Sequence, residues 1–359
     1  MTDAPITSVP PQSPHRARFE SIGAALPERR VTTSELMSRV RLRGRVNLER
    51  LTGIRERRVC AEGEDSLTLA AAAAEECLRH SSYAAGDLEM LICASISKFA
   101  DGLEQVFEPA LALLVRDAIG AHRAVAFDVG NACAGMMTGV YILTDFIARG
   151  VISRGMVVSG EYITSLSENA VPTVRSLLSR QLASLTVGDC GAAVIVERAP
   201  DDGSGALTTS GFVTVAQYSG LCIGTPCERG PGGEMVTQAR KLHDAGVAAS
   251  EPVLTQLLRD WPVDPAEIDW VIPHQTSSRA IRAGQVTLSR HFGARPRNVV
   301  VNVEEYGNTA STSHFLALYG HLREGRFRSG DNILLIALAS GLVMGCVAFT
   351  MDHLADRYG

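Results

Sequence analysis

Cys133 is the residue whose surroundings in the sequence most favour a reactive side chain. It follows a short apolar run at 124–128 and precedes an apolar stretch of helical spacing, so the chain turns from a strand into a helix beside the thiol. A thiol in the first turn of a helix lies at the positive end of the backbone dipole, which favours the thiolate. The pattern therefore predicts a nucleophile, against the alternative of an ordinary buried thiol. The glycines and alanines around Cys133 predict close approach by a substrate or by another backbone.

His274 and Asn308 are two further residues of useful chemistry at comparable places. His274 directly follows the apolar run 270–273, and Asn308 stands in a turn after a glycine. Each has an ordinary explanation when taken alone, because a histidine after a strand is more often a capping or core residue and asparagine tolerates left-handed turns. Ligands of open α/β folds bind at the carboxyl ends of strands, however, and all three residues lie at such ends or in the turns after them.

The elements that would position these residues alternate between strands and helices. Short apolar runs are separated by longer segments of helical periodicity, which indicates an α/β fold with strands covered on both faces. Most of the runs are continuously apolar, as in buried strands. The predicted strands are 90–95, 124–128, 155–160, 192–196, 270–273, 299–303 and 332–337.

The two halves of the chain repeat one another. A polar residue in a tight turn and two later glycines recur at an offset of 175 residues, as Cys133, Gly150 and Gly155 and then as Asn308, Gly325 and Gly330. The run 88–95 is likewise matched by 268–275 at an offset of 180. Duplication is the natural interpretation, and it places Cys133, His274 and Asn308 at equivalent strand ends.

Composition argues against several kinds of partner. Among 359 residues, 46% are hydrophobic and 20% charged, and the net charge of −5 has no long single-sign block, so nucleic acid is not an implied partner. Every apolar stretch is too short to span a bilayer. The eight cysteines form no CxxC pair and lie mostly in apolar segments, which predicts reduced thiols and a cytoplasmic protein.

Four segments are expected along the chain. Residues 1–17 are predicted to be a disordered tail, 18–200 an N-terminal half that carries the nucleophile, and 251–359 a C-terminal half that carries His274 and Asn308. Residues 201–250 contain two glycine-rich turns and are expected to link the halves and line a substrate channel.

Six motifs in collinear order resemble condensing enzymes of the 3-oxoacyl-ACP synthase III type. They lie at 52–58, 131–135, 187–193, 274–275, 306–311 and 340–342, and the resemblance extends over roughly 19–352. It implies the thiolase fold, with two duplicated βαβαβαββ-type halves in five αβαβα layers. It also implies an acyltransferase that joins acyl groups by Claisen condensation, needs no metal or cofactor, and uses acyl-CoA or acyl-phosphopantetheine thioesters.

The resemblance assigns roles to individual residues. Cys133 takes up the acyl group as a thioester, and the backbone N–H groups of Cys133 and Gly341 form the oxyanion hole. His274 and Asn308 hold the oxygen of the enolate in the second half-reaction. Arg279 matches a basic residue near the phosphopantetheine entrance.

Glu108 distinguishes two branches of this family. Decarboxylative members make their carbanion by losing carbon dioxide, whereas the branch of olefin and pyrone synthases uses a glutamate just before a proline as base, inserted from the neighbouring subunit. Glu108 precedes Pro109 and resembles that motif, which implies a catalytic homodimer. The ordinary alternative is that Glu108 caps a helix running to Ile119, with Pro109 in its first turn.

Other outcomes stay open at this point. The rivals are a decarboxylative synthase that uses malonyl-ACP, an acyltransferase to a hydroxyl or amine, and a non-catalytic partner subunit. Asn47 and Leu51 stand where coenzyme A-dependent relatives clamp the adenine, so delivery on coenzyme A or on a carrier protein is undecided. Cys222 and Cys227 have no second ligand pair and are interpreted as structural rather than metal-binding.

Overall fold

Two mixed β-sheets with the same strand order form the centre of the computed structural model, which describes residues 15–41, 46–100, 103–209, 212–261 and 263–358. The first sheet has the order β1 (Ala17–Ala25), β7 (Cys190–Arg198), β6 (Arg154–Glu161), β4 (Met90–Cys93) and β5 (Val125–Asp128). The second has the order β8 (Thr208–Thr209), β15 (Val343–Thr350), β14 (Asn332–Ala339), β12 (Trp270–Pro273) and β13 (Asn298–Val299), and β9 (Val213–Thr214) also pairs with β15.

The pairing in the two sheets confirms the duplication. β4 runs parallel to both β5 and β6, and β12 runs parallel to both β13 and β14. β7 and β15 then add antiparallel to β6 and β14. β4 and β12 have the predicted offset of 180 residues. His274 and Ala94 therefore occupy the same position in the two halves, directly after equivalent strands.

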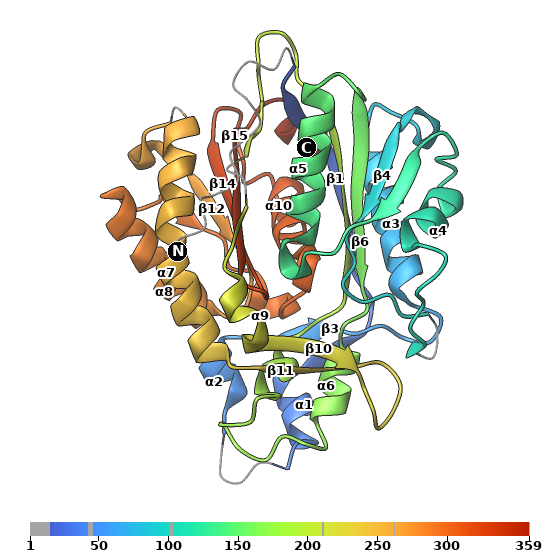
Figure 1. The fold of residues 1–359 in the computed structure, drawn as a ribbon, viewed down its shortest axis with the longest axis vertical. Helices are drawn as coiled ribbons and strands as arrows, with labels where there is room; N and C mark the ends of the chain where they lie inside the picture. Colours follow the sequence, from blue (N-terminus) through green and yellow to red (C-terminus); the bar gives the residue numbers. More distant parts are fainter. Residues whose placement is uncertain (1–14, 42–45, 101–102, 210–211, 262, 359) are drawn as a thin grey trace.

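Helices cover the sheets in five layers (Figure 1). The first sheet carries α3 (Ser66–Arg79) and α4 (Leu111–Ala118) on its outer face, and the second carries α7 (Ala239–Asp260) and α8 (Ser278–Phe292) on its own. Between the sheets lie α5 (Gly135–Ala148) and α10 (Ser313–Arg323), whose apolar side chains join the largest hydrophobic cluster. The expected thiolase-type αβαβα arrangement is confirmed.

The register of the repeat differs from the sequence-based match at the turn that matters most. Ala132 and Ala310 both have positive φ, at +45° and +55°, and each begins a 3-10 turn, η3 (Ala132–Ala134) or η7 (Ala310–Thr312), that leads directly into α5 or α10. These turns are 178 residues apart, so Cys133 corresponds to Ser311 and not to Asn308. The offset of 175 holds for Gly150 and Gly325 because α10 has 11 residues where α5 has 14.

Two predicted strands were too long. The run 90–95 forms a strand only as far as Cys93, the end of β4. The run 299–303 contributes only β13, because Val303 begins the short helix α9 (Val303–Tyr306). The side-chain oxygen of Gln275 accepts the backbone N–H groups of Asn302 and Val303, at 3.0 and 3.2 Å, and so turns the chain away from the sheet. Buried Val303 then packs with Ile54 and Ile281.

The remaining elements extend the core at one end (Figure 1). They are β2 (Arg30–Thr32), α1 (Thr33–Ser38), α2 (Leu48–Thr52), β3 (Glu56–Arg58), α6 (Ser165–Ala170) and the hairpin of β10 (Cys222–Pro226) and β11 (Gly233–Thr237). The expected linker 201–250 is partly regular, since β8 and β9 join the second sheet. Residues 1–14 of the predicted tail lie outside the described residues. No described helix has the length and apolar character needed to cross a membrane.

Candidate active site

Cys133 is held in a tight turn between the two sheets. It lies in η3, directly before α5, and its half-buried side chain packs against a small cluster of Ile163, Val187 and Ala310. A Cβ atom at Gly135 would come within 2.9 Å of the carbonyl oxygen of Ala94. The small residue at 135 therefore allows close approach of another backbone, one of the two explanations that the sequence left open.

The acidity of the Cys133 thiol is the reverse of the sequence-based prediction. The helix start was expected to favour the thiolate, but burial raises the pKa of Cys133 to about 12, and the nearby carboxyl of Glu161 raises it further. The N-terminal position is present, but desolvation of the charge outweighs it. Cys133 is therefore a neutral thiol in the protein without substrate.

His274 is a buried and neutral imidazole. Its backbone N–H donates to the carbonyl oxygen of Ile336, and its ring Nδ1 lies 2.8 Å from the hydroxyl oxygen of Ser313. The ring stacks on that of His314, with 5.7 Å between centroids. Burial lowers the pKa of His274 to about 3, and the neighbouring His314 adds to this. The ring is therefore uncharged near neutral pH. The hydrogen bond with Ser313 involves Nδ1, and Nε2 takes no part in it.

Asn308 lies where the two halves of the chain meet. Its backbone N–H donates to the carbonyl oxygen of Thr186, and its carbonyl oxygen accepts the N–H of Gly188. Its side-chain oxygen accepts the N–H of Ala310 at 3.0 Å, which directs the amide NH₂ away from the turn as a donor. A Cβ atom at Gly188 would lie 2.1 Å from the carbonyl oxygen of Tyr306, so glycine is required for this contact.

The three residues are brought together at the start of α10. Cys133 packs with Ala310, Asn308 bonds to the N–H of Ala310, and His274 bonds to Ser313, the first residue of the helix. η3 also contacts η7 and β14 directly. The structure thus places a thiol, an imidazole and an amide from three separate parts of the chain around one turn. Asn308 reaches this turn from the end of α9 rather than from the end of a strand.

Gly341 follows a strand that contacts the Cys133 turn, whereas Arg279 lies on an exposed helix surface. Gly341 follows the end of β14, the strand that contacts η3, and its φ of +117° is accessible to glycine. Arg279 lies in the first turn of α8 and is exposed. Its predicted contact with a phosphopantetheine group remains a prediction.

Glu108 does not cap a helix, so the ordinary explanation for it was wrong. α4 begins only at Leu111, and the carboxylate of Asp128 accepts the N–H groups of Leu111 and Ala112 at 3.2 and 2.8 Å. Asp128, at the end of β5, takes the place that the sequence suggested for Glu108. Glu108 is exposed and has no hydrogen bond or ion pair among the residues that the structure describes.

A cavity of about 360 Å³ separates the segment before Glu108 from the turn before Cys133. Its walls come from the end of β4, from the segment 105–107 and from 129–132. Lys98 also lines it and forms an ion pair with Asp128, 2.6 Å apart. The cavity is therefore lined by the segments that precede the candidate base and the candidate nucleophile, and its wall is partly apolar.

Three residues of the site were missed from the sequence. Ser313 and His314 contact the ring of His274, and buried Glu161 accepts hydrogen bonds from the N–H groups of Ile96 and Ser97. Glu161 ends a strand whose core 155–160 was predicted, so the strand-end argument was sufficient to find it. No spacing rule connects Ser313 or His314 with His274, because the contact is made only in three dimensions. Within the described residues, no cluster of His, Cys, Asp and Glu has a metal-binding arrangement.

Comparison with family profiles gives two matches. Residues 127–212 match 3-oxoacyl-[acyl-carrier-protein (ACP)] synthase III, and residues 258–351 match the C-terminal part of the same enzyme. The chain is 31% identical over 343 residues to the β-ketoacyl-[acyl-carrier-protein] synthase III of Symbiobacterium thermophilum, covering 91% of this chain and 96% of the relative. The enzyme of the same name from Rhizobium rhizogenes is 29% identical over 339 residues, covering 92% and 98%.

Solved structures have the same fold. The 3-oxoacyl-[acyl-carrier-protein] synthase III of Aquifex aeolicus superimposes with a TM-score of 0.79 at 28% identity, covering 93% of this chain and all of that chain (100%). OleA of Xanthomonas campestris, solved as a variant with bound lauric acid and lauroyl-CoA, gives 0.80 at 24% identity, covering 94% and 99%. Because one relative is more than 30% identical and the match covers 91% of this chain, the chain belongs to the 3-oxoacyl-ACP synthase III family. Members of this family are acyltransferases that condense acyl thioesters on the thiolase fold.

Proposed function

We propose that this protein joins two acyl thioesters head to head without decarboxylation, through an acyl-Cys133 intermediate and with Glu108 as the base. The observation that carries the proposal is the group of Cys133, His274 and Asn308 around the start of α10, together with an exposed glutamate that has no structural partner among the described residues. A glutamate used only to cap a helix would bond to backbone N–H groups, and Asp128 does that here.

The first half-reaction transfers an acyl group to Cys133. The Cys133 sulfur attacks the carbonyl carbon of the incoming thioester, a new C–S bond forms, and the bond to the departing thiol breaks. The thiol proton goes to the departing sulfur, so no net charge remains in the buried site. The backbone N–H groups of Cys133 and Gly341 would stabilise the oxyanion. This exchange suits a nucleophile that is neutral at rest, because the charge forms only in the transition state.

The second half-reaction forms the carbon–carbon bond. Glu108 removes a proton from the α-carbon of a second acyl thioester, and the resulting enolate oxygen accepts hydrogen bonds from His274 Nε2 and Asn308 Nδ2. The α-carbon attacks the carbonyl of acyl-Cys133, the C–S bond breaks, and the sulfur recovers a proton from Glu108. The product is a 2-alkyl-3-oxoacyl thioester. Neutral His274 serves as a donor here without adding a buried charge.

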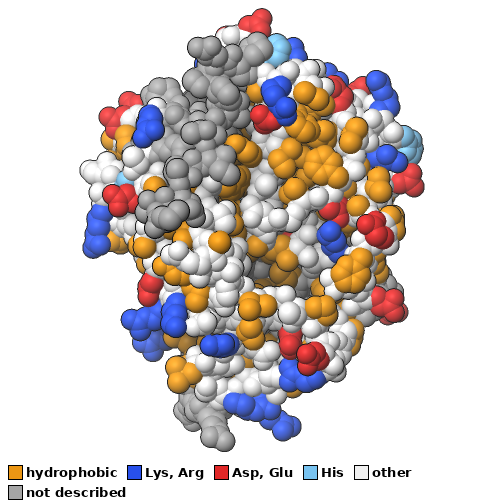
Figure 2. All heavy atoms as spheres, in the orientation of Figure 1, with side chains coloured by type: hydrophobic (Ala, Val, Ile, Leu, Met, Phe, Trp, Pro, Cys, Tyr) orange, Lys and Arg blue, Asp and Glu red, His pale blue; other side chains and the backbone are white. Residues whose placement is uncertain are grey.

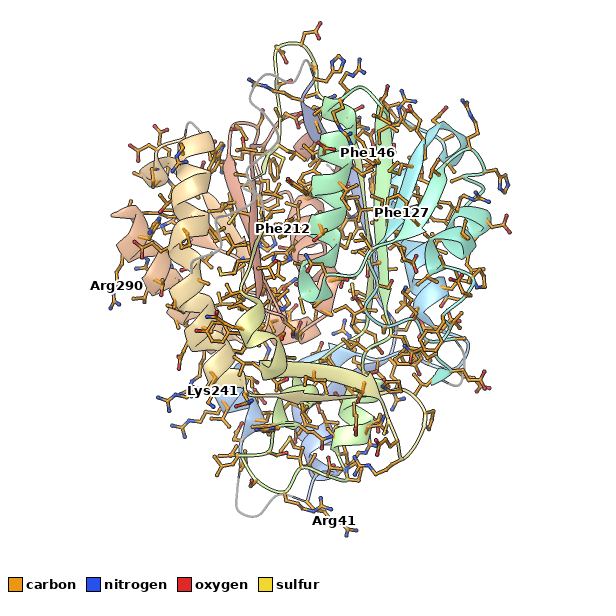
Figure 3. All side chains as sticks on the ribbon, viewed as in Figure 1. Arg41, Phe127, Phe146, Phe212, Lys241 and Arg290 are labelled. Carbon is orange, nitrogen blue, oxygen red and sulfur yellow. The ribbon has the colours of Figure 1, made fainter. Side chains whose placement is uncertain are left out.

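We propose that the active form is a homodimer built on the outer edge of β5. This strand is the last in its sheet, Val125 is 61% exposed, and Phe107 on the segment next to Glu108 is 74% exposed. Figure 2 shows hydrophobic side chains gathered on one face, where Figure 3 labels Phe127 of β5 and Phe146 of α5. An uncovered edge strand with apolar neighbours favours pairing with a second copy, which would carry Glu108 toward the site of the partner.

The substrates proposed are acyl groups on coenzyme A or on acyl carrier protein. The bound lauroyl-CoA of OleA supports the former, and the carrier-protein substrate in the names of the relatives supports the latter. Asn47, at the position linked to adenine binding, has a structural role, because its side chain caps α2 through the N–H of Arg50 at 2.7 Å. A cytoplasmic location, expected from the cysteines, is part of the same proposal.

Two variants test the reaction with acyl-CoA as the only substrate. The wild-type protein should gain one acyl mass at Cys133 and release a 3-oxo product with two chains. Glu108→Gln should keep the acyl-Cys133 mass and lose condensation by about 10²-fold or more, the usual scale for a general base. Intact-protein and product mass spectrometry give both results. Cys133→Ala is the control and should show neither.

The rival reactions give different products. Unchanged condensation by Glu108→Gln, with malonyl-ACP as extender, would identify a decarboxylative synthase. An ester or amide formed only after addition of an alcohol or amine would identify transfer to those acceptors. Absence of any acyl-Cys133 would contradict the whole proposal and leave the non-catalytic partner subunit.

A further inference from the structure

Ser313 is a buried hydroxyl with one described hydrogen-bond partner. It is 1% exposed, it is the first residue of α10, and its oxygen lies 2.8 Å from Nδ1 of His274. The neighbouring Thr312 differs, since its hydroxyl donates to the carbonyl oxygen of Thr309 at 2.7 Å. In the part of the chain that the structure describes, the only acceptor found for the Ser313 proton is therefore the imidazole.

This geometry decides which ring nitrogen carries the proton. If the Ser313 hydroxyl donates to Nδ1, the hydroxyl is satisfied and the proton of the neutral ring resides on Nε2. If Nδ1 instead carried the proton and donated to Ser313, the hydroxyl proton would be buried without an acceptor, which costs stability. The first arrangement satisfies both partners and gives His274 a donor at Nε2, a nitrogen with no hydrogen bond among the described residues.

His314 fixes the same ring from a second direction. Its Nε2 lies 2.9 Å from the carbonyl oxygen of Ile336, which also accepts the backbone N–H of His274. Its ring stacks on His274 with an interplanar angle of 27°. One carbonyl thus anchors both histidines, and the His274 ring is held between the Ser313 hydroxyl and the face of His314. A flip of the His274 ring would replace Nδ1 by a carbon and so break the bond to Ser313.

We propose that Ser313 is a positioning residue that holds His274 in the tautomer with its proton on Nε2. The catalytic effect of this tautomer rests on the proposed function, because an Nε2 donor stabilises the enolate oxygen in the condensation step. The assignment of the tautomer itself does not depend on the reaction, since it can be measured in the protein without substrate. Ser313 acts on the substrate only through His274, so it is not itself a catalytic residue.

The first test is NMR of the wild-type protein labelled with ¹⁵N-histidine, with His274→Gln to assign the signal. We expect His274 to show a directly bonded proton on Nε2 and an unprotonated Nδ1 from pH 6 to 8, a range above the pKa of about 3 for this ring. A proton on Nδ1 would overturn the proposal. This measurement needs no substrate and no further variant, so it stands whether or not the protein condenses acyl groups.

The second test compares Ser313→Ala with two other variants. Ser313→Ala should shift the His274 signals toward the Nδ1-protonated tautomer and lower the condensation rate about 10-fold, with acylation of Cys133 unchanged. Ser313→Thr keeps the hydroxyl and should restore the wild-type tautomer. Thr312→Val removes the adjacent buried hydroxyl and should leave the tautomer as in wild type. An unaltered tautomer in Ser313→Ala would refute the role of Ser313 even if activity fell.

Discussion

His274 and His314 are buried as neutral rings, and this determines how the protein responds to acid. Burial lowers the pKa of His274 to about 3 and that of His314 to about 4, both from the ordinary value of 6.5. Between pH 6.5 and these values the unfolded chain binds protons that the folded protein does not, so stability rises with pH in this window. Acidification below pH 6.5 should therefore destabilise the fold.

A urea titration at several pH values checks this prediction. Each histidine should contribute a loss of roughly 1.4 kcal/mol per pH unit well below pH 6.5. Asp189 opposes it, because burial raises the pKa of that carboxyl to about 6 and favours the folded state in acid. The informative quantity is thus the difference between wild type and His314→Gln, which should have the shallower slope between pH 6.5 and 4. Equal slopes for wild type and His314→Gln would contradict the prediction.

At the residue scale, the sequence pointed to the groups of the candidate site but not to their protonation states. Cys133, His274 and Asn308 were found from strand ends and turns, which are local features. The neutral thiol, the depressed pKa of His274 and the bond to Ser313 depend on burial and on contacts between residues distant in the chain. The position at a helix start suggested a thiolate. In the folded protein, desolvation of the Cys133 thiolate outweighs the effect of the helix start and raises the pKa.

At the scale of elements, three glycines decide how α3 lies on the first sheet. Gly23 of β1, Gly160 of β6 and Gly191 of β7 face the backbone of this helix, and a Cβ atom on Gly191 would come within 2.1 Å of the carbonyl oxygen of Leu69. Two rigid backbones meet there, so no side-chain rotation can relieve the overlap. The strand–helix contact is as close as it is because these positions lack side chains.

Replacing one of these glycines gives a clear prediction. Gly191→Ala should lower the free energy of unfolding by about 1–3 kcal/mol or more, because it forces α3 away from the sheet. The matched control is Gly284→Ala in α8, where no heavy atom lies within 4 Å of the added Cβ. That change should stabilise the protein by about 0.5–1 kcal/mol, since alanine restricts the unfolded chain. Urea midpoints measure both, and a tolerated Gly191→Ala would show that the helix can shift freely.

The alternation of elements was largely predictable, and the exceptions have physical reasons. Buried parallel strands such as β4 and β12 are continuous apolar runs with few other interpretations. The run 299–303 has the same composition, but the side chain of Gln275 captures its backbone N–H groups and ends the strand early. The start of α4 was misplaced for a similar reason, because its cap is Asp128, from another part of the chain. Long-range caps are invisible to local patterns.

At the scale of the whole molecule, duplication explains why the site lies between the halves. The two halves have the same strand order, and the turns η3 and η7, which lead into α5 and α10, contact each other. The repeat was visible in the sequence, but its register was not, because α10 is shorter than α5 and shifts the later matches by three residues. The structure pairs Cys133 with Ser311, whose hydroxyl contacts buried Glu161, so the second half has a hydroxyl at the level of the nucleophile.

The proposed dimer makes a prediction about subunits rather than residues. Within one subunit the segment before Glu108 and the turn before Cys133 line one cavity, so a base acting in its own subunit is the alternative to one acting in the partner. Cys133→Ala and Glu108→Gln subunits, each inactive in condensation alone, can be co-expressed with different tags and purified as mixed dimers. If Glu108 serves the partner, the site with intact Cys133 receives an intact glutamate from the other chain.

Such mixed dimers should recover about half of the wild-type condensation activity per dimer, because one of the two symmetric sites is complete. A base that acts within its own subunit predicts no recovery, since neither chain then holds both groups. Dimers that carry Cys133→Ala in one chain and both substitutions in the other are the control and should be inactive. Failure of the two tags to purify together would contradict the β5 interface itself. Val125→Arg, which places a charge on that exposed edge, should separate the subunits, leave acylation of Cys133 intact and abolish condensation.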